Sequence, residues 1–228
     1  MSEALDPPQS TLMLDTRLVR PDQRFKVWAD SIGVIFDPSL DGRTDPSQFR
    51  AELHASMYGQ VFCGRVDSVT QRFDRSEKKI IADGLDHYIV QVFKSGYCEV
   101  VDGNTTRTVR PGDIYIIDAA APLEAVDYAF EHVTMMIPRD FLADRLVSPD
   151  AHHRRIIPGN TPLARLLYDY IITLDEVAAT TSLKERELMV DPFLSLTERL
   201  LNHHSGETTL DPYNPATNLA LLSTIKRY

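Results

Sequence analysis

The 228-residue chain has little from which covalent or metal-bound frameworks are built, with two cysteines and one tryptophan. Cys63 and Cys98 cannot form a disulfide framework and lack a C-x-x-C neighbour, so we expect two reduced thiols. Apolar runs are short, as in residues 115–117, and fall well below the ~18 apolar residues of a membrane span. Residues 1–8 are acidic and polar, which predicts no signal peptide. We therefore expect a cytoplasmic protein with no membrane partner.

Clustered positive charge is also lacking. The chain has 24 Lys and Arg against 33 Asp and Glu, which gives a formal net charge of −9. A surface that binds nucleic acid needs grouped Lys and Arg side chains. The charge therefore indicates that most of this chain does not contact DNA.

Motifs for catalysis are missing as well. There is no G-x-x-x-x-G-K phosphate loop and no G-x-S-x-G nucleophile elbow. Small antiparallel barrels that bind a metal use an H-x-H pair on one strand, but His87 is followed by Ile89 at the position of the second ligand. His54 and His132 stand alone, and the remaining histidines form adjacent pairs whose side chains diverge. We predict no catalytic residues, no metal and no cofactor.

The N-terminal part predicts a flexible arm over residues 1–20, with at most one short ordered segment around residues 12–18, followed by a helix. The helix begins after Asp22 as N-cap and ends at Gly33. Its apolar residues recur at helical spacing: Phe25, Trp28, Ala29 and Ile32. Trp28 either anchors this helix on a sheet or offers a ligand a stacking platform; the spacing favours the anchor.

Residues 49–137 carry the pattern of short strands. They are rich in Val, Ile, Tyr and Phe in these segments: 49–58, 61–70, 87–94, 96–101, 105–109, 114–118 and 132–137. Asp102-Gly103-Asn104 predicts a hairpin turn. Many short antiparallel strands indicate a small barrel or jelly roll. We assign residues 21–156 to this unit together with its preceding helix.

The pattern becomes helical after Pro138. Thr161-Pro162 opens a helix with apolar residues at i, i+3, i+4 and i+7. Ser182 and Glu185 form a capping box for the next helix, and Pro192 is expected to kink it. The pair predicts an antiparallel hairpin over residues 157–205 that packs on the barrel, on a second copy, or on both. The fold class is therefore α+β.

The strand over residues 87–94 has one face that suits a ligand pocket. This face combines apolar walls with the neutral polar groups of His87 and Gln91. It faces either a pocket or solvent, and periodicity favours neither. The predicted ligand-binding residues are His87, Gln91, Phe93, Tyr58, Arg65 and Tyr115.

Four segments in order carry a family resemblance. They are Asp86–Val90 before Lys94-Ser95-Gly96, Val109–Asp118 with its R-P-G-D turn, Met136–Leu142, and Leu222–Tyr228. Together they resemble the N-terminal regulatory part of AraC/XylS-type transcription regulators, whose sensing domain is cupin-like. The resemblance spans residues 25–228.

The resemblance implies an effector-sensing barrel, a hairpin that forms a homodimer, and operator DNA bound only through a C-terminal helix-turn-helix domain. We expect a linker over residues 206–218, the start of that DNA-binding domain over 219–228, and its remainder absent from this chain. The predicted effector is a small molecule. The predicted dimerisation residues are Leu163, Leu167, Tyr170, Leu174, Leu196 and Leu200.

Two alternatives stay open. The chain is otherwise a cupin-type metal-dependent enzyme, which the missing H-x-H disfavours. It is otherwise a protein-interaction module that binds no ligand, with its barrel filled by bulky side chains: Phe62, Phe73, Tyr88 and Phe93.

Overall fold

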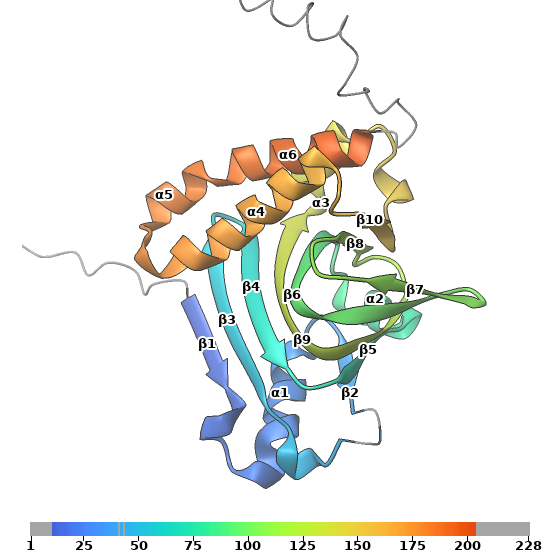
Figure 1. The fold of residues 1–228 in the computed structure, drawn as a ribbon, viewed down its shortest axis with the longest axis vertical. Helices are drawn as coiled ribbons and strands as arrows, with labels where there is room; N and C mark the ends of the chain where they lie inside the picture. Colours follow the sequence, from blue (N-terminus) through green and yellow to red (C-terminus); the bar gives the residue numbers. More distant parts are fainter. Residues whose placement is uncertain (1–10, 41, 43, 204–228) are drawn as a thin grey trace, which may run out of the picture.

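An antiparallel sheet of ten strands forms the body of the computed structural model, which describes residues 11–40, 42 and 44–203 (Figure 1). The strands run in the order β1-β3-β4-β9-β6-β8-β10. Off this path, β5 pairs with β9, β2 pairs with β5, and β7 pairs with β6. The sheet bends but is not closed. The predicted α+β class, with a helix before the strands and helices after them, is confirmed. The strands are β1 Thr11–Asp15, β2 Asp37–Ser39, β3 Ala51–Tyr58, β4 Val61–Ser68, β5 Gln71–Arg75, β6 His87–Asp102, β7 Thr105–Val109, β8 Ile114–Asp118, β9 Leu123–Pro138 and β10 Arg155–Ile157.

The two longest strands, β6 and β9, fold the sheet on itself. The first half of β6 pairs with β8 and its second half with β7, while β9 pairs first with β5 and then with β4. Their mutual ladder has irregularities between Phe93 and Tyr97. Gly96 lies at this bend with φ 72°, and a Cβ there would lie 2.4 Å from the Tyr128 carbonyl oxygen. The bend therefore requires glycine. The sequence predicts two separate strands here, over 87–94 and 96–101, whereas the structure has one strand, β6, that bends at Gly96.

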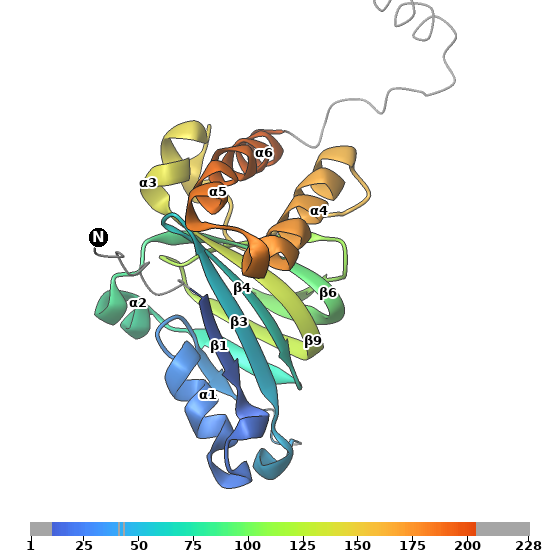
Figure 2. The same ribbon diagram turned by 90° about the vertical axis from the view of Figure 1, so that its left-hand side faces the viewer.

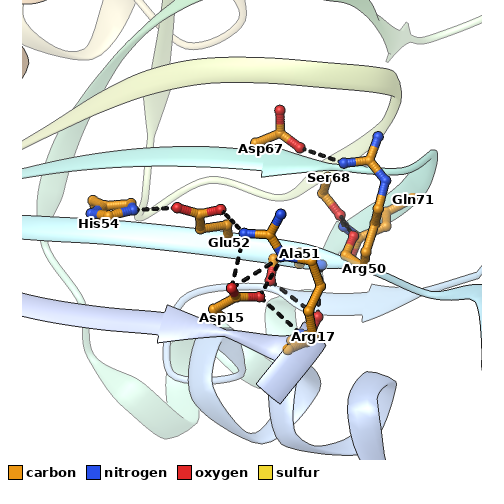
Figure 3. A network of polar contacts seen from close by, with 10 residues as sticks. Asp15, Arg17, Arg50, Ala51, Glu52, His54, Asp67, Ser68 and Gln71 are labelled. Atoms are coloured by element: carbon orange, nitrogen blue, oxygen red, sulfur yellow. Dashed lines mark hydrogen bonds and ion pairs between the residues drawn. The ribbon is translucent and has the colours of Figure 1, made fainter. Parts of the chain in front are cut away.

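Residues 11–18 form β1 and a 3-10 helix, at the place where the sequence allows one short ordered segment within the N-terminal arm. β1 pairs antiparallel with β3 along its whole length. Thr16 is fully buried and exchanges hydrogen bonds with the backbone of Ala51, its hydroxyl accepting at 2.8 Å. Arg17 bridges Asp15 and Glu52 beside it (Figure 3). These contacts fix a segment whose composition alone indicates a loose chain.

Helix α1 (Arg24–Ile32) lies against one end of the sheet. It ends at Gly33 as predicted, but a 3-10 turn precedes it and Gln23, rather than Asp22, occupies the N-cap. Trp28 is 1% exposed, and its indole nitrogen donates to the Gln71 side chain at 2.6 Å. Sequence patterning misses β2, β5, β10, the first half of β9 and helix α2 (Glu77–Asp83).

The C-terminal helices cover one face of the sheet (Figure 2). α4 (Pro162–Val177) is capped by Thr161, and the Ser182–Glu185 capping box precedes α5 as predicted. Met189 separates α5 from α6. Pro192 lies in the first turn of α6, where a backbone N–H has no partner within the helix, so proline is tolerated there. The remaining helices are α3 Arg139–Leu142, α5 Leu183–Leu188 and α6 Val190–Asn202.

The predicted linker 206–218 and the segment 219–228 lie outside the described residues, as do residues 1–10. Within residues 11–203, apart from 41 and 43, no helix is long and apolar enough to cross a membrane.

Candidate functional site: a cavity between the halves of the bent sheet

A cavity of about 90 Å³ lies on the face of the sheet opposite the C-terminal helices. Both halves of the bent sheet contribute to it, and Trp28 and the residues after α1 close one end. Its wall is mostly apolar. The lining residues are Trp28, Ile32, Ile35, Phe36, Leu53, Phe62, Gly64, Val66, Phe73, Ile89, Gln91, Cys98, Tyr115, Ile117, Leu123, Ala125, Asp127, His132, Thr134 and Met136.

Three polar side chains on β6 and β9 form a connected group in this wall. The Gln91 amide donates to the Thr134 hydroxyl at 3.1 Å and lies 3.2 Å from His132 Nδ1. The Thr134 hydroxyl also lies 3.0 Å from that nitrogen. The His132 ring stacks on Phe130 with ring centroids 4.9 Å apart. Burial lowers the pKa of His132 to about 3, so the imidazole is neutral at ordinary pH.

A buried carboxyl group stands beside them. Asp127 is 3% exposed and lies opposite Cys98 on the neighbouring strand, whose thiol favours the ionised carboxylate. Burial raises the pKa of Asp127 to about 7. Its Oδ2 lies 4.0 Å from His132 Nε2, yet burial shifts both groups toward their neutral forms. The pair is therefore a neutral polar contact rather than an ion pair below pH 7.

Tyr115 contributes to the lining, but its hydroxyl lies behind the wall. Its side chain is 1% exposed, and within the described residues no hydrogen-bonding group reaches its oxygen. Leaving such a group buried and unpaired costs ~1–3 kcal/mol. The oxygen is buried from the open space as well, so a ligand in the cavity does not meet it in this arrangement.

Comparison with known proteins decides the family. The family model described as AraC-binding-like domain matches residues 28–202. This range contains strands β2 to β10, and with them all the strands that line the cavity, together with the C-terminal helices α3 to α6. The chain belongs to the AraC-binding-like domain family.

One protein of similar sequence and one solved structure of similar fold can be compared with this AraC-binding-like domain. An uncharacterized protein in the nit 5′ region of Bacillus sp. (strain OxB-1) is 22% identical over 183 residues, 74% of this chain and 71% of that protein. The crystal structure of the AraC-like transcriptional activator CuxR superposes with a TM-score of 0.78 at 18% identity, covering 89% of this chain and 73% of that one. At that identity the likeness shows a shared fold.

The structure places the six candidate ligand-binding residues on different surfaces of the AraC-binding-like domain. Gln91 and Tyr115 line the cavity and are paired across β6 and β8. Phe93 is fully buried behind the lining, where its ring lies 5.4 Å from that of His132. His87 is half-buried at the start of β6 and does not line the cavity. Both faces of the 87–93 strand are buried, so neither faces solvent.

Tyr58 and Arg65 lie on the opposite, helix-facing side of the sheet. The Tyr58 hydroxyl donates to the Leu174 carbonyl, and Arg65 pairs with Asp175 at 3.3 Å, both partners being on α4. These two side chains hold the hairpin to the sheet because their strand positions are out of phase with the cavity. They are fixing contacts for α4 rather than neighbours of a ligand in this cavity.

The candidate dimerisation residues also face their own chain. Leu167, Leu174 and Leu200 are no more than 4% exposed and belong to the core between helices and sheet. The others, which are Leu163, Tyr170 and Leu196, are half-buried against the same core. Leu166 is the exposed leucine of α4, at 59%. The apolar stripe of these amphipathic helices packs on the sheet of the same chain, and so it is not exposed to a second copy.

The four bulky side chains that the sequence offers to fill the barrel do not fill the cavity. Phe62 and Phe73 form part of its wall, whereas Tyr88 packs on the helix side. Among the described residues, no group of three or more His, Cys, Asp or Glu is arranged to hold a metal ion.

Sequence reasoning misses the cavity's polar residues on β9, Asp127, His132 and Thr134. The reason is a change of alternation at the bend, where Ala129 has φ 35°. Odd-numbered positions 123, 125 and 127 face the cavity before it, and even-numbered positions 132, 134 and 136 after it. A strict period of two cannot connect these residues; a search for one phase shift per long strand could have found them.

Proposed function

We propose that this chain is the effector-sensing and dimerisation domain of an AraC-type transcription regulator, with the cavity as the effector site. The observation that carries the proposal is the mostly apolar cavity with buried polar groups inside a domain of the AraC-binding-like family. Such a domain acts in the cytoplasm, where its DNA is, and as a binding module it performs no reaction.

The proposed signal path is short, because a single layer of sheet separates cavity from helices. On β6, Gln91 lines the cavity while Val90 and Val92 pack under the helices. On β4, Gly64 lines the cavity while the next residue, Arg65, pairs with Asp175 of α4. An effector that fits one position of β4 and β6 better than another would shift the helices by its difference in affinity for the two arrangements.

The proposed dimer uses the outer face of the hairpin, since the inner stripe is already covered. Leu166 of α4 is exposed there. The variant Leu166→Glu is expected to weaken self-association in light scattering at tens of micromolar, while Ile81→Glu, at an 85% exposed position of α2 outside the hairpin, serves as the matched control. A wild-type chain that is monomeric at these concentrations would remove the dimer from the proposal.

Operator DNA is the proposed partner of another part of the regulator. The formal net charge of −9 supports this, because the phosphate backbone repels an acidic surface. We expect purified chain to show no sequence-selective duplex binding in a gel-shift assay at physiological salt.

A thermal-shift screen tests the effector site. Binding to the folded state raises the melting temperature in a saturable way. We expect small apolar molecules with one polar group to do so, and the cavity-filling variant Ala125→Leu to lose the response. Ala82→Leu adds the same group at an exposed position of α2 and is expected to keep it. A response that is equal in both variants would show that binding occurs elsewhere.

A further inference from the structure

We propose that the cavity selects an uncharged molecule of about one ring that carries a neutral polar group, and rejects carboxylates and phosphates of the same size. The inference rests on the proposed effector site and adds the chemical class of its ligand. It is argued from the charges, the neutral polar groups and the volume of the cavity.

The cavity offers an anion no positive partner. Among the described residues, no Lys or Arg lines it. Arg75, on the same strand as the lining residue Phe73, is fully engaged: it pairs with Asp83 at 2.7 Å and donates to the carbonyls of Ile35 and Ala119. A carboxylate moved from water into this wall would lose its hydration without a compensating charge, which strongly disfavours binding.

The buried acid adds to that discrimination. Asp127 is the one Asp or Glu among the lining residues of the described chain. As it ionises near neutral pH, a second negative charge beside it becomes still less favourable. A protonated amine would instead require two desolvated charges in a mostly apolar wall, and their attraction rarely exceeds that joint desolvation cost. An uncharged ligand avoids both.

The polar groups of the wall are uncharged as well. Gln91, His132 and Thr134 bond to one another, and burial keeps the His132 ring neutral. A ligand hydroxyl, carbonyl or similar neutral group can bond to them, whereas an ionic group would meet no opposite charge.

The volume sets the size. A cavity of about 90 Å³ is below the ~300–1,000 Å³ of pockets for drug-sized ligands and nearer the ~150 Å³ cavity that binds benzene. Trp28, Phe36 and Phe73 provide flat apolar walls. A single ring or a short branched chain fits this space.

Isothermal titration with three matched probes tests the selection. Benzyl alcohol, benzoate and benzylamine share a ring and differ in charge. At pH 6.5 we expect benzyl alcohol to bind at least tenfold more tightly than either ion. Toluene, which lacks a polar group, measures the apolar contribution.

Thr134→Val, which replaces a hydroxyl of the lining by a methyl group of similar size, tests the polar contact. We expect about a tenfold loss of benzyl alcohol affinity with toluene affinity unchanged. Tyr88→Phe is the matched control, because the Tyr88 hydroxyl is bonded to Arg139 and Pro149 outside the cavity; it should change neither affinity. The circular dichroism spectrum of each variant verifies the fold.

The outcomes separate the two proposals. If benzoate or benzylamine binds most tightly and Ala125→Leu blocks it, the selection of neutral ligands is wrong and the effector site stands. If no probe binds to the folded chain at millimolar concentration, both proposals fail. If Thr134→Val binds benzyl alcohol as well as the wild type, the assignment of the polar contact is wrong.

Discussion

The two faces of the central sheet are buried to a similar degree and packed for different purposes. Under the helices, the Tyr58 hydroxyl reaches the Leu174 carbonyl and no residue of that core lines the cavity. On the other face, the polar side chains of Gln91 and Thr134 are also buried, but they border an open volume of about 90 Å³. Burial therefore does not distinguish packing from binding; open space beside polar groups does.

Unpaired buried atoms also occur away from the cavity, and Arg186 at the edge of the helix-facing core is an example. Arg186 of α5 is 4% exposed and donates to the Ala178 carbonyl, while its Nε and Nη1 find no hydrogen-bond partner in the described chain. Its guanidinium lies over the Tyr58 ring, 5.8 Å from the centroid. The bond to Ala178 holds the turn after α4 to α5.

Large-to-small substitutions provide the largest expected contrast. Leu167→Ala removes a fully buried side chain from the filled face, and we expect it to cost ~4 kcal/mol of unfolding free energy. Leu123→Ala, on the cavity wall, should cost ~2 kcal/mol, because that side chain already borders open space. Urea denaturation of both variants measures the difference. Equal losses would contradict the distinction between the faces.

The next contrast uses pH and the variant Asp127→Asn. In wild type, the unfolded Asp127 loses its proton near its ordinary pKa of 3.8, whereas the folded one holds it up to about 7. The folded state therefore binds more protons between these values, so this residue lowers the unfolding free energy as pH rises. His132 acts oppositely, since its folded pKa of about 3 lies below the ordinary 6.5.

Between pH 4 and 6.5, the opposite pH dependences that Asp127 and His132 give to the unfolding free energy nearly cancel in wild type. In Asp127→Asn only the contribution of His132 remains. We expect the stability of the variant relative to wild type to increase by about 2 kcal/mol from pH 5 to pH 7, at ~1.4 kcal/mol per pH unit until the slope falls off near the folded pKa of about 7. Chemical denaturation at several pH values measures it. A difference that does not change with pH would show that Asp127 ionises normally in the folded chain.

Replacing a buried alanine by valine on each face of the sheet compares the free space beside the two positions. Ala164→Val in the helix-facing core, where the residue is 0% exposed, should cost ~2 kcal/mol through overpacking and lower helix propensity. Ala125→Val points into the cavity on a strand and should change stability by less than ~0.5 kcal/mol. Thermal denaturation distinguishes them. A loss at position 125 as large as that at 164 would indicate a filled cavity.

Two tyrosine-to-phenylalanine changes give the smallest effects, with opposite signs. Tyr58→Phe removes a partnered hydroxyl and should lose ~1 kcal/mol, because the Leu174 carbonyl is left unpaired. Tyr115→Phe removes an unpartnered one and should be neutral or gain up to ~1 kcal/mol. Destabilisation by Tyr115→Phe similar to that of Tyr58→Phe would show that the Tyr115 hydroxyl has a partner in solution.

Local sequence signals predict much of this fold. The Ser182–Glu185 capping box, the Thr161 cap and the strands Thr105–Val109 and Ile114–Asp118 occur where residue type and spacing place them. What local signals cannot give is long-range pairing. β1 forms because β3 offers it a partner, and β6 continues through Gly96 because β9 bends with it.

The candidate site is predicted less completely, for a related reason. Alternation along residues 87–93 brings Gln91 to the cavity, and Tyr115 enters by pairing with it across β8. The same alternation, taken without its phase shift, leaves out Asp127 and His132. Tyr58 and Arg65 are polar residues in strands like the others, and only the packing of α4 shows that they serve the hairpin.

The central claim is that a small molecule in the cavity is felt by the helices across one layer of sheet. Methyl and amide chemical shifts during a titration with benzyl alcohol test it most directly. We predict saturable shifts at Ile89 and Ile117 in the cavity wall, accompanied at the same midpoint by shifts at Val90 and along α4. Shifts confined to exposed residues, or cavity shifts with α4 unchanged, would contradict the account.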